Sequence, residues 1–408
     1  MATAIIRNPT ATANAVQKFA PAAQRTGVGL SLSGGGYRAA LFHLGALRRL
    51  NELGILARVR TISSVSGGSI LSAHLAASLS WPLHGPVTDW EERVAKPFQA
   101  FTSINIRNAP VLKRFLLPWN WWRSSVQVET LADEYESKLT RVKLVELPST
   151  PVFIYCATDL AFGVNWIFRK EQIGDYQAGY IRPTPPDWPL AKAVAASSCF
   201  PPVFDPLRMP FAVGLYKGGK AQGVAADAAR AGVALSDGGV YDNLALEPIW
   251  KDHAIVLSSD GGAVFDFEAD KNFLGRVQRY VSVQGNQALA LRKRWLISNF
   301  LTGVMQGTYW GVGSVTANYG PKAPAGYSEE LATMISKIRT DLDRFSEAEK
   351  AILENHGYLL AEAAVQQHLP EQVPQPVPLL AIPHPEWMDE AKAKEALKDS
   401  WKRKILGH

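Results

Sequence analysis

The sequence twice places a short strand-like segment directly before a glycine-rich turn and a helical pattern. The first unit is VGLSLS (28–33), followed by glycines and by apolar residues at helical spacing over 37–54. The second is VRTISSVS (59–66), followed by SILSAHLAASL (69–79). Such runs are typical of buried strands, and alternating strands and helices indicate an α/β fold. We therefore predict a central, largely parallel sheet flanked by helices. Further strand candidates are residues 151–159, 231–239 and 253–262.

The middle of the chain, about residues 80–130, is rich in aromatic residues and looks irregular. Within it, KRFLLPWNWWR (113–123) combines tryptophan, leucine and basic residues. This composition suits a membrane interface, and it equally suits an insertion that packs in the core. Both interpretations stay open from the sequence.

The C-terminal third predicts further helices and one extended segment. A long helix with a basic cluster is expected over 276–304. Another is expected over 345–358, because Ser346 and Glu349 form a capping-box pattern and Gly357 is a stop signal. The proline-rich stretch 370–387 predicts a linker, and the residues after it predict a basic amphipathic helix.

Composition argues against a membrane-spanning or secreted protein and against a cysteine metal site. The 408 residues contain no apolar run near the roughly 18 residues of a membrane-spanning helix, and no apolar signal segment near residue 1. Cys156 and Cys199 stand in apolar contexts without metal-ligand spacing, so we expect buried free thiols. The net charge of +6 favours an anionic partner such as lipid headgroups, but no nucleic-acid recognition motif is present. We expect a cytoplasmic protein, either wholly soluble or peripherally bound to membranes.

The glycine loop SGGGYR (33–38) could serve a bound phosphate or a charge that develops during a reaction. A P-loop is excluded, because no Lys-Ser or Lys-Thr follows the last glycine. A dinucleotide fingerprint is formally met by Gly34, Gly36 and Ala39, which would make the protein a nucleotide-dependent oxidoreductase. That fold needs an acidic residue at the end of the second strand, and TISSVSGGS has none.

The second strand instead ends in a candidate nucleophile. SVSGG (64–68) matches the G-x-S-x-G elbow around Ser66, except that Ser64 replaces the first glycine. In such elbows the N–H that follows the nucleophile, here that of Gly67, donates to the oxyanion. A glycine-rich loop after a neighbouring strand supplies the second donor, and residues 34–36 are placed to do so. Such donors are often the largest single catalytic contribution.

A serine nucleophile needs a base, and the sequence offers no well-placed histidine. None of the eight histidines lies in a glycine-flanked loop after a late strand. A partly desolvated carboxylate could act directly, because burial raises its pKa toward neutral pH. Asp237 and Asp260 both follow predicted strands and precede Gly-Gly, so the residues alone leave two candidates, each of which could also be a simple turn.

Taken together, these motifs resemble those of the patatin-like phospholipases. GGGYR (34–38), SVSGG (64–68) and DGGVYDNLALEP (237–248) follow the family's order of oxyanion loop, elbow and acid. ASSCFPPVFDP (196–206) and ATDLAFG (157–163) resemble two further family segments.

The resemblance implies a Ser66–Asp237 dyad without histidine. It favours Asp237 over Asp260, because Asn243 and Pro248 accompany the first Asp-Gly-Gly only. It also implies an oxyanion hole at Gly34, Gly35, Gly36 and Gly67, and a role for Arg38 in orienting the loop or binding a phosphate headgroup.

The resemblance further implies an α/β/α fold and a lipid acyl hydrolase that uses no metal and no cofactor. Its substrates would be phospholipids or lysophospholipids. The alternative is a non-catalytic, membrane-associated scaffold on the same fold. The expected organisation is an N-terminal arm (1–26), a catalytic domain (27–320) with an insertion at about 80–130, a helical extension (321–369) and a linker with a basic helix (370–408).

Overall fold

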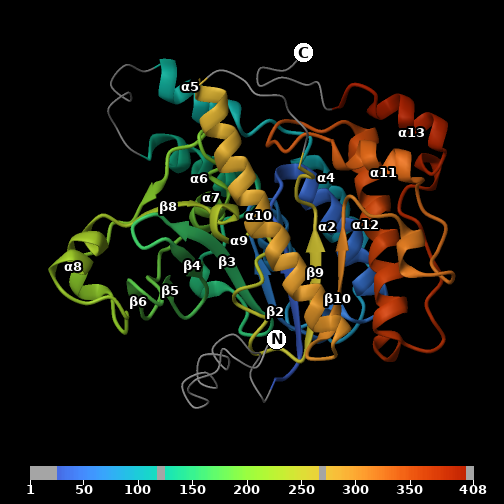
Figure 1. Ribbon diagram of the computed structural model, residues 1–408, viewed down its shortest axis with the longest axis horizontal. Helices are drawn as coiled ribbons and strands as arrows, with labels where there is room; N and C mark the ends of the chain where they lie inside the picture. The colour runs from blue at the N-terminus through green and yellow to red at the C-terminus, as the bar shows by residue number, and fades with distance from the viewer. Residues whose placement is uncertain (1–24, 117–124, 266–272, 401–408) are drawn as a thin grey trace, which may run out of the picture.

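The computed structural model describes residues 25–116, 125–265 and 273–400 of the chain. Ten strands of these residues form one sheet (Figure 1). Every strand predicted from the sequence is present, and five others were missed. The strands are β1 (Val28–Leu32), β2 (Val59–Ser64), β3 (Val152–Asp159), β4 (Val164–Phe168), β5 (Ile173–Asp175), β6 (Gly179–Ile181), β7 (Leu207–Arg208), β8 (Ala234–Asp237), β9 (Ile255–Asp260) and β10 (Gln306–Gly311).

The sheet is mixed. Its order is β10-β9-β1-β2-β3-β4-β5-β6, with β8 paired to β3 and β7 paired to β8. The strands from β10 to β3 are parallel, and all pairs beyond β3 are antiparallel. We expected a largely parallel sheet. The antiparallel part arises because only residues 160–163 connect β3 to β4, too few for the crossover that a parallel pair needs. The predicted α/β class, with a central sheet flanked by helices, is confirmed.

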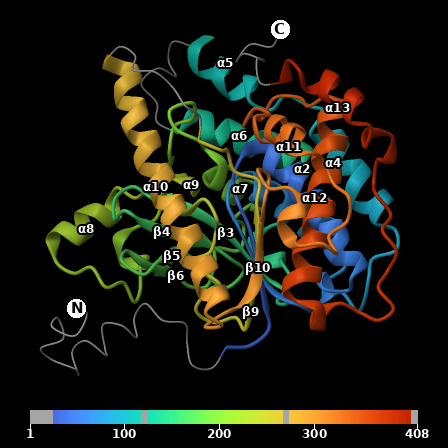
Figure 2. The same ribbon diagram turned by 45° about the vertical axis from the view of Figure 1, so that its right-hand side comes forward.

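Helices cover both faces of the sheet. Figure 2 shows α2 and α12 beside one face of the parallel strands and α10 beside the other. The α-helices are α2 (Gly36–Glu52), α3 (Gly67–Ser78), α4 (Lys96–Phe101), α5 (Asn108–Leu116), α6 (Val126–Lys138), α7 (Leu190–Ser198), α8 (Val224–Ala231), α9 (Gly239–Asp242), α10 (Phe273–Leu301), α11 (Glu329–Ser336), α12 (Glu347–His368) and α13 (Glu390–Leu397). Shorter helical turns are η1 (Leu56–Arg58), η2 (Glu91–Ala95), η4 (Leu144–Glu146), η5 (Val213–Leu215), η6 (Thr316–Tyr319), η7 (Pro370–Gln372) and η8 (Pro385–Trp387).

The two faces of the sheet bury separate apolar clusters. On β9, Leu257 joins the large cluster that includes α2 and α12, whereas its neighbour Val256 packs with Leu296 of α10. Successive side chains of a strand point to opposite faces, so both faces of β9 are covered. This coverage explains why β1 is buried along its whole length and reads as a continuous apolar run.

Helices α2 and α12 cross so closely that two glycines are needed. A Cβ on Gly45 would lie 1.8 Å from the carbonyl oxygen of Glu354, and one on Gly357 would lie 1.9 Å from that of Phe42. The predicted capping box of Ser346 and Glu349 begins α12. The predicted stop at Gly357 is wrong, since α12 continues to His368. This glycine serves helix packing and not helix termination.

The described part of the aromatic-rich middle is irregular over 80–89 and largely helical from Glu91 onward. Trp90, Phe98 and Phe101, which precede the segment 113–123, are buried in the main core. Residues 117–124, most of the segment with membrane-interface composition, lie outside the described residues. Among the helices that the structure describes, none is both long enough and apolar enough to span a bilayer.

The C-terminal segments pack on the same body. The predicted linker 370–387 lies along α2, where Arg49 donates to the carbonyl oxygens of Pro378 (2.8 Å) and Leu379 (3.4 Å). The first part of the predicted basic helix is present as α13 (Glu390–Leu397), within which Ala393 and Leu397 are buried, and its most basic part, 402–404, lies outside the described residues. Residues 1–24, most of the predicted arm, and residues 401–408 lie outside the described part of the chain.

Candidate active site

The strand register brings the predicted nucleophile and acid together. Strand β2 ends at Ser64, which pairs with Tyr155 of β3. Strand β8 runs the opposite way along β3 and ends at Asp237, which pairs with Ala157. The two strand ends therefore meet beside β3, two residues apart. Leu32 of β1 pairs with Ser64, so the glycine loop after β1 leaves the sheet at the same edge.

Ser66 has the backbone of a nucleophile elbow. Its φ of 51° and ψ of −118° are strained for a residue with a side chain, and it stands directly before α3. Its N–H donates to the Ser197 hydroxyl oxygen (3.0 Å), and that hydroxyl donates to the Cys156 carbonyl oxygen (2.6 Å). Ser69 lies 2.9 Å from the same hydroxyl. A buried serine network thus holds the elbow against β3 and α7.

Asp237 is the carboxylate that contacts Ser66. It is 3% exposed, and the Ser66 side chain lies close enough to lower its pKa. The Gly239 N–H donates to its Oδ1 (2.7 Å), and the Thr158 hydroxyl donates to its main-chain oxygen (2.8 Å). Burial raises the pKa of Asp237 to about 6, although the hydrogen bonds from Gly239 and Ser66 lower it. A carboxylate with this pKa can accept a proton near neutral pH.

Asp260, the other candidate acid, is engaged elsewhere. Its carboxylate pairs with the Lys293 ammonium (2.5 Å) and accepts hydrogen bonds from Tyr309 (2.7 Å) and the Gly262 N–H (2.9 Å). Burial raises its pKa, but Lys293 outweighs this and the pKa is lowered. Such a carboxylate is a weak base, so the geometry favours Asp237, as the sequence resemblance did.

Among the described residues, no histidine contacts Ser66. His43 lies nearest in the fold, beneath the glycine loop, where its ring contacts Ser259 Oγ (2.7 Å) and the Ser33 carbonyl oxygen (3.0 Å). Burial lowers the pKa of His43 to about 4, so it is neutral at physiological pH. Its two ring nitrogens brace β1 and β9 and do not face the nucleophile.

The glycine loop has two N–H groups that remain available as donors. The N–H of Gly34 donates to the Asn243 carbonyl oxygen (3.0 Å), so Gly34 can belong to an oxyanion hole only by shaping the loop and not as a donor. Within the described residues, the N–H groups of Gly35, Gly36 and Gly67 have no acceptor. Gly35 and Gly36 have φ angles of 141° and 57°, which favour glycine. A Cβ on Gly67 would lie 2.1 Å from the Gly36 carbonyl oxygen, so loop and elbow touch.

Arg38 anchors the glycine loop to the interior of the protein. It is buried, and its guanidinium donates to the carbonyl oxygens of Gly261 (3.1 Å), Ser336 (3.2 Å) and Ile338 (2.7 Å). Of the two roles that we predicted, these contacts match orientation of the loop. They do not match the substrate-binding role, because all three acceptors are main-chain atoms inside the protein.

Sequence reasoning did not assign three residues that shape the site. Ser197 holds the Ser66 amide, Thr158 holds the backbone of Asp237, and Asn243 holds that of Gly34. The Asn243 side chain lies between three turns, close enough that a Cβ on Gly34 would be 2.4 Å from its Oδ1. Each of these residues lies in a segment that resembles the family. The residue that each one contacts is far away in the sequence, so the contact could not be predicted.

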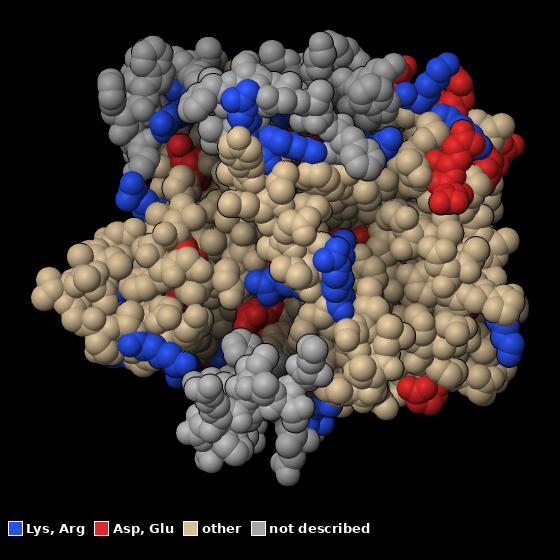
Figure 3. All heavy atoms as spheres, viewed as in Figure 1, with Lys and Arg blue, Asp and Glu red and all other residues tan. Residues whose placement is uncertain are grey.

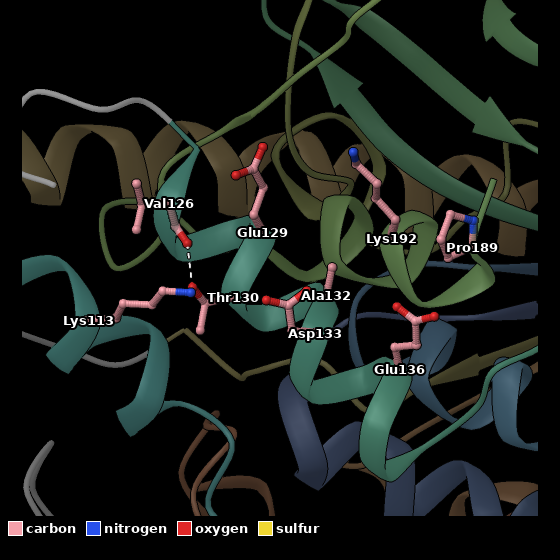
Figure 4. Close-up of a pocket in the computed structure, with 9 residues that line it drawn as sticks. All are labelled: Lys113, Val126, Glu129, Thr130, Ala132, Asp133, Glu136, Pro189 and Lys192. Carbon is pink, nitrogen blue, oxygen red and sulfur yellow. Dashed lines mark hydrogen bonds between the residues drawn. The ribbon is translucent and has the colours of Figure 1, made fainter. Parts of the chain in front are cut away.

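Two cavities lie outside the dyad. One of about 400 Å³ lies between α5, α6 and the start of α7, and its wall mixes Lys113 and Lys192 with Glu129, Asp133 and Glu136 (Figure 4). The other, of about 320 Å³, lies between α10 and the loops after β9 and β10; Gly262, Lys293 and Tyr309 line it. Within the described ranges, no three histidine, cysteine or acidic side chains gather as metal ligands would.

The sequence matches the model of a family described as patatin-like phospholipase over residues 30–250. This match covers more than half of the chain, which therefore belongs to the patatin-like phospholipase family. The family relationship supports lipid acyl hydrolase activity. No curated protein matches the sequence.

Similar solved structures include two of human GIVD cytosolic phospholipase A2. One has 14% identity and a TM-score of 0.41, and the alignment covers 93% of this chain and 63% of that chain. The other, with methyl gamma-linolenyl fluorophosphonate, has 15% identity, a TM-score of 0.46 and coverages of 89% and 62%. VipD from Legionella pneumophila has 12% identity, a TM-score of 0.35 and coverages of 85% and 68%. The chain thus spans about three fifths of the length of the human enzyme.

Proposed function

We propose that this protein hydrolyses carboxylic ester bonds of phospholipids or lysophospholipids through a Ser66–Asp237 dyad. The observation that carries the proposal is the position of the Ser66 side chain beside the buried Asp237 carboxylate, close enough to lower the pKa of that carboxyl. The N–H groups of Gly35, Gly36 and Gly67, close to this pair, support an oxyanion hole. Family membership supports a lipid ester as the substrate.

The proposed reaction has two halves. Asp237 takes the proton of the Ser66 hydroxyl while Oγ attacks the ester carbonyl carbon, and the N–H groups stabilise the oxyanion. Collapse breaks the ester C–O bond, and the proton on Asp237 passes to the departing alcohol. Asp237 then takes a proton from a water that attacks the acyl-enzyme, and the fatty acid leaves as Ser66 regains its proton.

The test compares Ser66→Ala with Ser78→Ala, a matched change at the far end of α3. Each variant is assayed on a chromogenic acyl ester and on defined phospholipids, with the lipid products separated by class. We expect Ser66→Ala to abolish hydrolysis and labelling by a fluorophosphonate probe, while Ser78→Ala retains both. Hydrolysis that persists in a folded Ser66→Ala protein would contradict the dyad. Vesicle binding by a wild-type protein without turnover would favour the scaffold alternative.

A further inference from the structure

Helix α10 presents an apolar face to solvent. Tyr280, Val281 and Leu291 are 61%, 64% and 60% exposed. At 100° per residue these side chains fall within about 100° of one another, on a side that also carries the exposed Gln284 and Gln287. The opposite side holds Leu289, Leu296 and Phe300, which pack in the second apolar cluster. A surface helix normally turns polar residues outward, so three large apolar side chains exposed among uncharged polar ones mark an interaction surface.

The charge of α10 is one-sided. Its 29 residues contain no acidic side chain and five basic ones. Arg292 and Lys293 face the protein, where they lie close to Asp242 (3.7 Å) and Asp260 (2.5 Å), respectively. Arg294 is exposed beside the apolar side. Residues 266–272, outside the described part, add three acidic residues and one lysine. In Figure 3 the surface over α10 is mainly tan with blue side chains.

The position of α10 links this face to the candidate active site. Arg292 donates to the Tyr241 carbonyl oxygen (3.1 Å) in α9, which directly follows Asp237 and Gly238. Lys293 is bound to Asp260, whose loop abuts the glycine loop after β1. The helix thus lies across the loops on two sides of the dyad, as its path over the front of the molecule shows (Figure 1).

We propose that the outward face of α10 docks on an anionic membrane surface. An apolar side flanked by arginine, without acidic residues, fits a helix lying in the headgroup region of a bilayer. A second copy of the chain fits less well, because two-fold pairing would set the basic α10 against itself. The inference rests on the proposed function only in that the bilayer would present the substrate.

The test is co-sedimentation with vesicles of phosphatidylcholine alone and of phosphatidylcholine with phosphatidylglycerol. We expect wild type to bind the anionic vesicles and a Val281→Asp/Leu291→Asp variant to lose about tenfold or more in partition coefficient. Arg294→Gln should lose about fivefold, on the anionic vesicles only. The matched control is Val224→Asp on α8. Val224 is 88% exposed, and this variant should bind the vesicles like wild type.

Hydrolysis of a soluble short-chain ester serves as the folding control, because α10 does not contact the reacting atoms. Every variant should retain the wild-type rate in solution. Vesicle binding that depends on α10 without any ester hydrolysis would contradict the proposed function and still support the docking surface. Wild-type binding by the Val281→Asp/Leu291→Asp protein would overturn the docking surface. So would a wild-type dimer that this variant dissociates.

Discussion

Replacing Asp237 with asparagine should inactivate the protein and stabilise it. Asparagine has the same shape and can accept from Gly239 and donate to Ser66, but it carries no charge. Burial raises the pKa of Asp237 from its ordinary 3.8 to about 6. At about 1.4 kcal/mol per pKa unit, this difference means that the charged form costs about 3 kcal/mol of folding free energy.

The sign and the pH window follow from proton binding. Between pH 3.8 and about 6 the folded protein holds a proton on Asp237 that the unfolded chain has released. The unfolding free energy of wild type therefore falls as pH rises through this window. The Asp237→Asn protein lacks this loss. Its unfolding free energy should therefore equal that of wild type below the window and exceed it by the full amount above the window.

The assay is urea unfolding of both proteins, followed by tryptophan fluorescence, at about pH 4 and about pH 8. For a change of about 3 kcal/mol we expect the midpoint at the higher pH to rise by about 1 M. Asp133→Asn, at an exposed position of α6, is the matched control and should not change the midpoint. Equal stability of Asp237→Asn and wild type at the higher pH would refute the reasoning. A gain of the same size at both pH values would refute it too.

Three further outcomes are expected. First, kcat/KM on a soluble ester should fall about tenfold per pH unit below pH 6, where the dyad carboxylate gains its proton; a limb near pH 4 would point to another base. Second, Gly67→Ala should lower kcat by about 10²–10³, because its Cβ would displace Gly36, whereas Gly85→Ala, in open space, should not. Normal activity of Gly67→Ala would argue against this oxyanion hole. Third, the pKa of buried Asp175 is raised to about 7 by burial and by Asp159. Asp159→Asn should therefore remove part of the loss of unfolding free energy that wild type shows as pH rises toward 7, measured by urea unfolding; an unchanged pH dependence would contradict the coupling.

The local units of the fold could be predicted because their signals are local. Strand β1 is a buried apolar run bounded by glycine, and α2 after it carries the period of an amphipathic helix. Strand β10 was missed because QGTYWG has neither alternation nor an apolar run, although Trp310 is fully buried. Its assignment depends on pairing with β9, which is decided by the rest of the sheet.

The candidate site shows the same division. Ser66 and Asp237 could be named because each stands in a short motif at a strand end. The contacts that orient them could not, because Ser197 reaches the Ser66 amide from 131 positions away. A glycine or an arginine can also serve several structural roles that the sequence does not distinguish. Gly357 packs a helix crossing where a stop was expected, and Arg38 faces main-chain oxygens inside the protein.

The contacts of Arg38 determine when the candidate site can form as the chain is synthesised. The family match ends at residue 250, yet the loop that begins α2 depends on acceptors at Ser336 and Ile338 and on the Asp341 carbonyl oxygen, which the Tyr37 N–H contacts at 2.9 Å. A nascent chain that has reached residue 250 already carries both dyad residues. It lacks the segment from Ser336 to Asp341 that holds the glycine loop in position, so the proposed site can form only after that segment has been made.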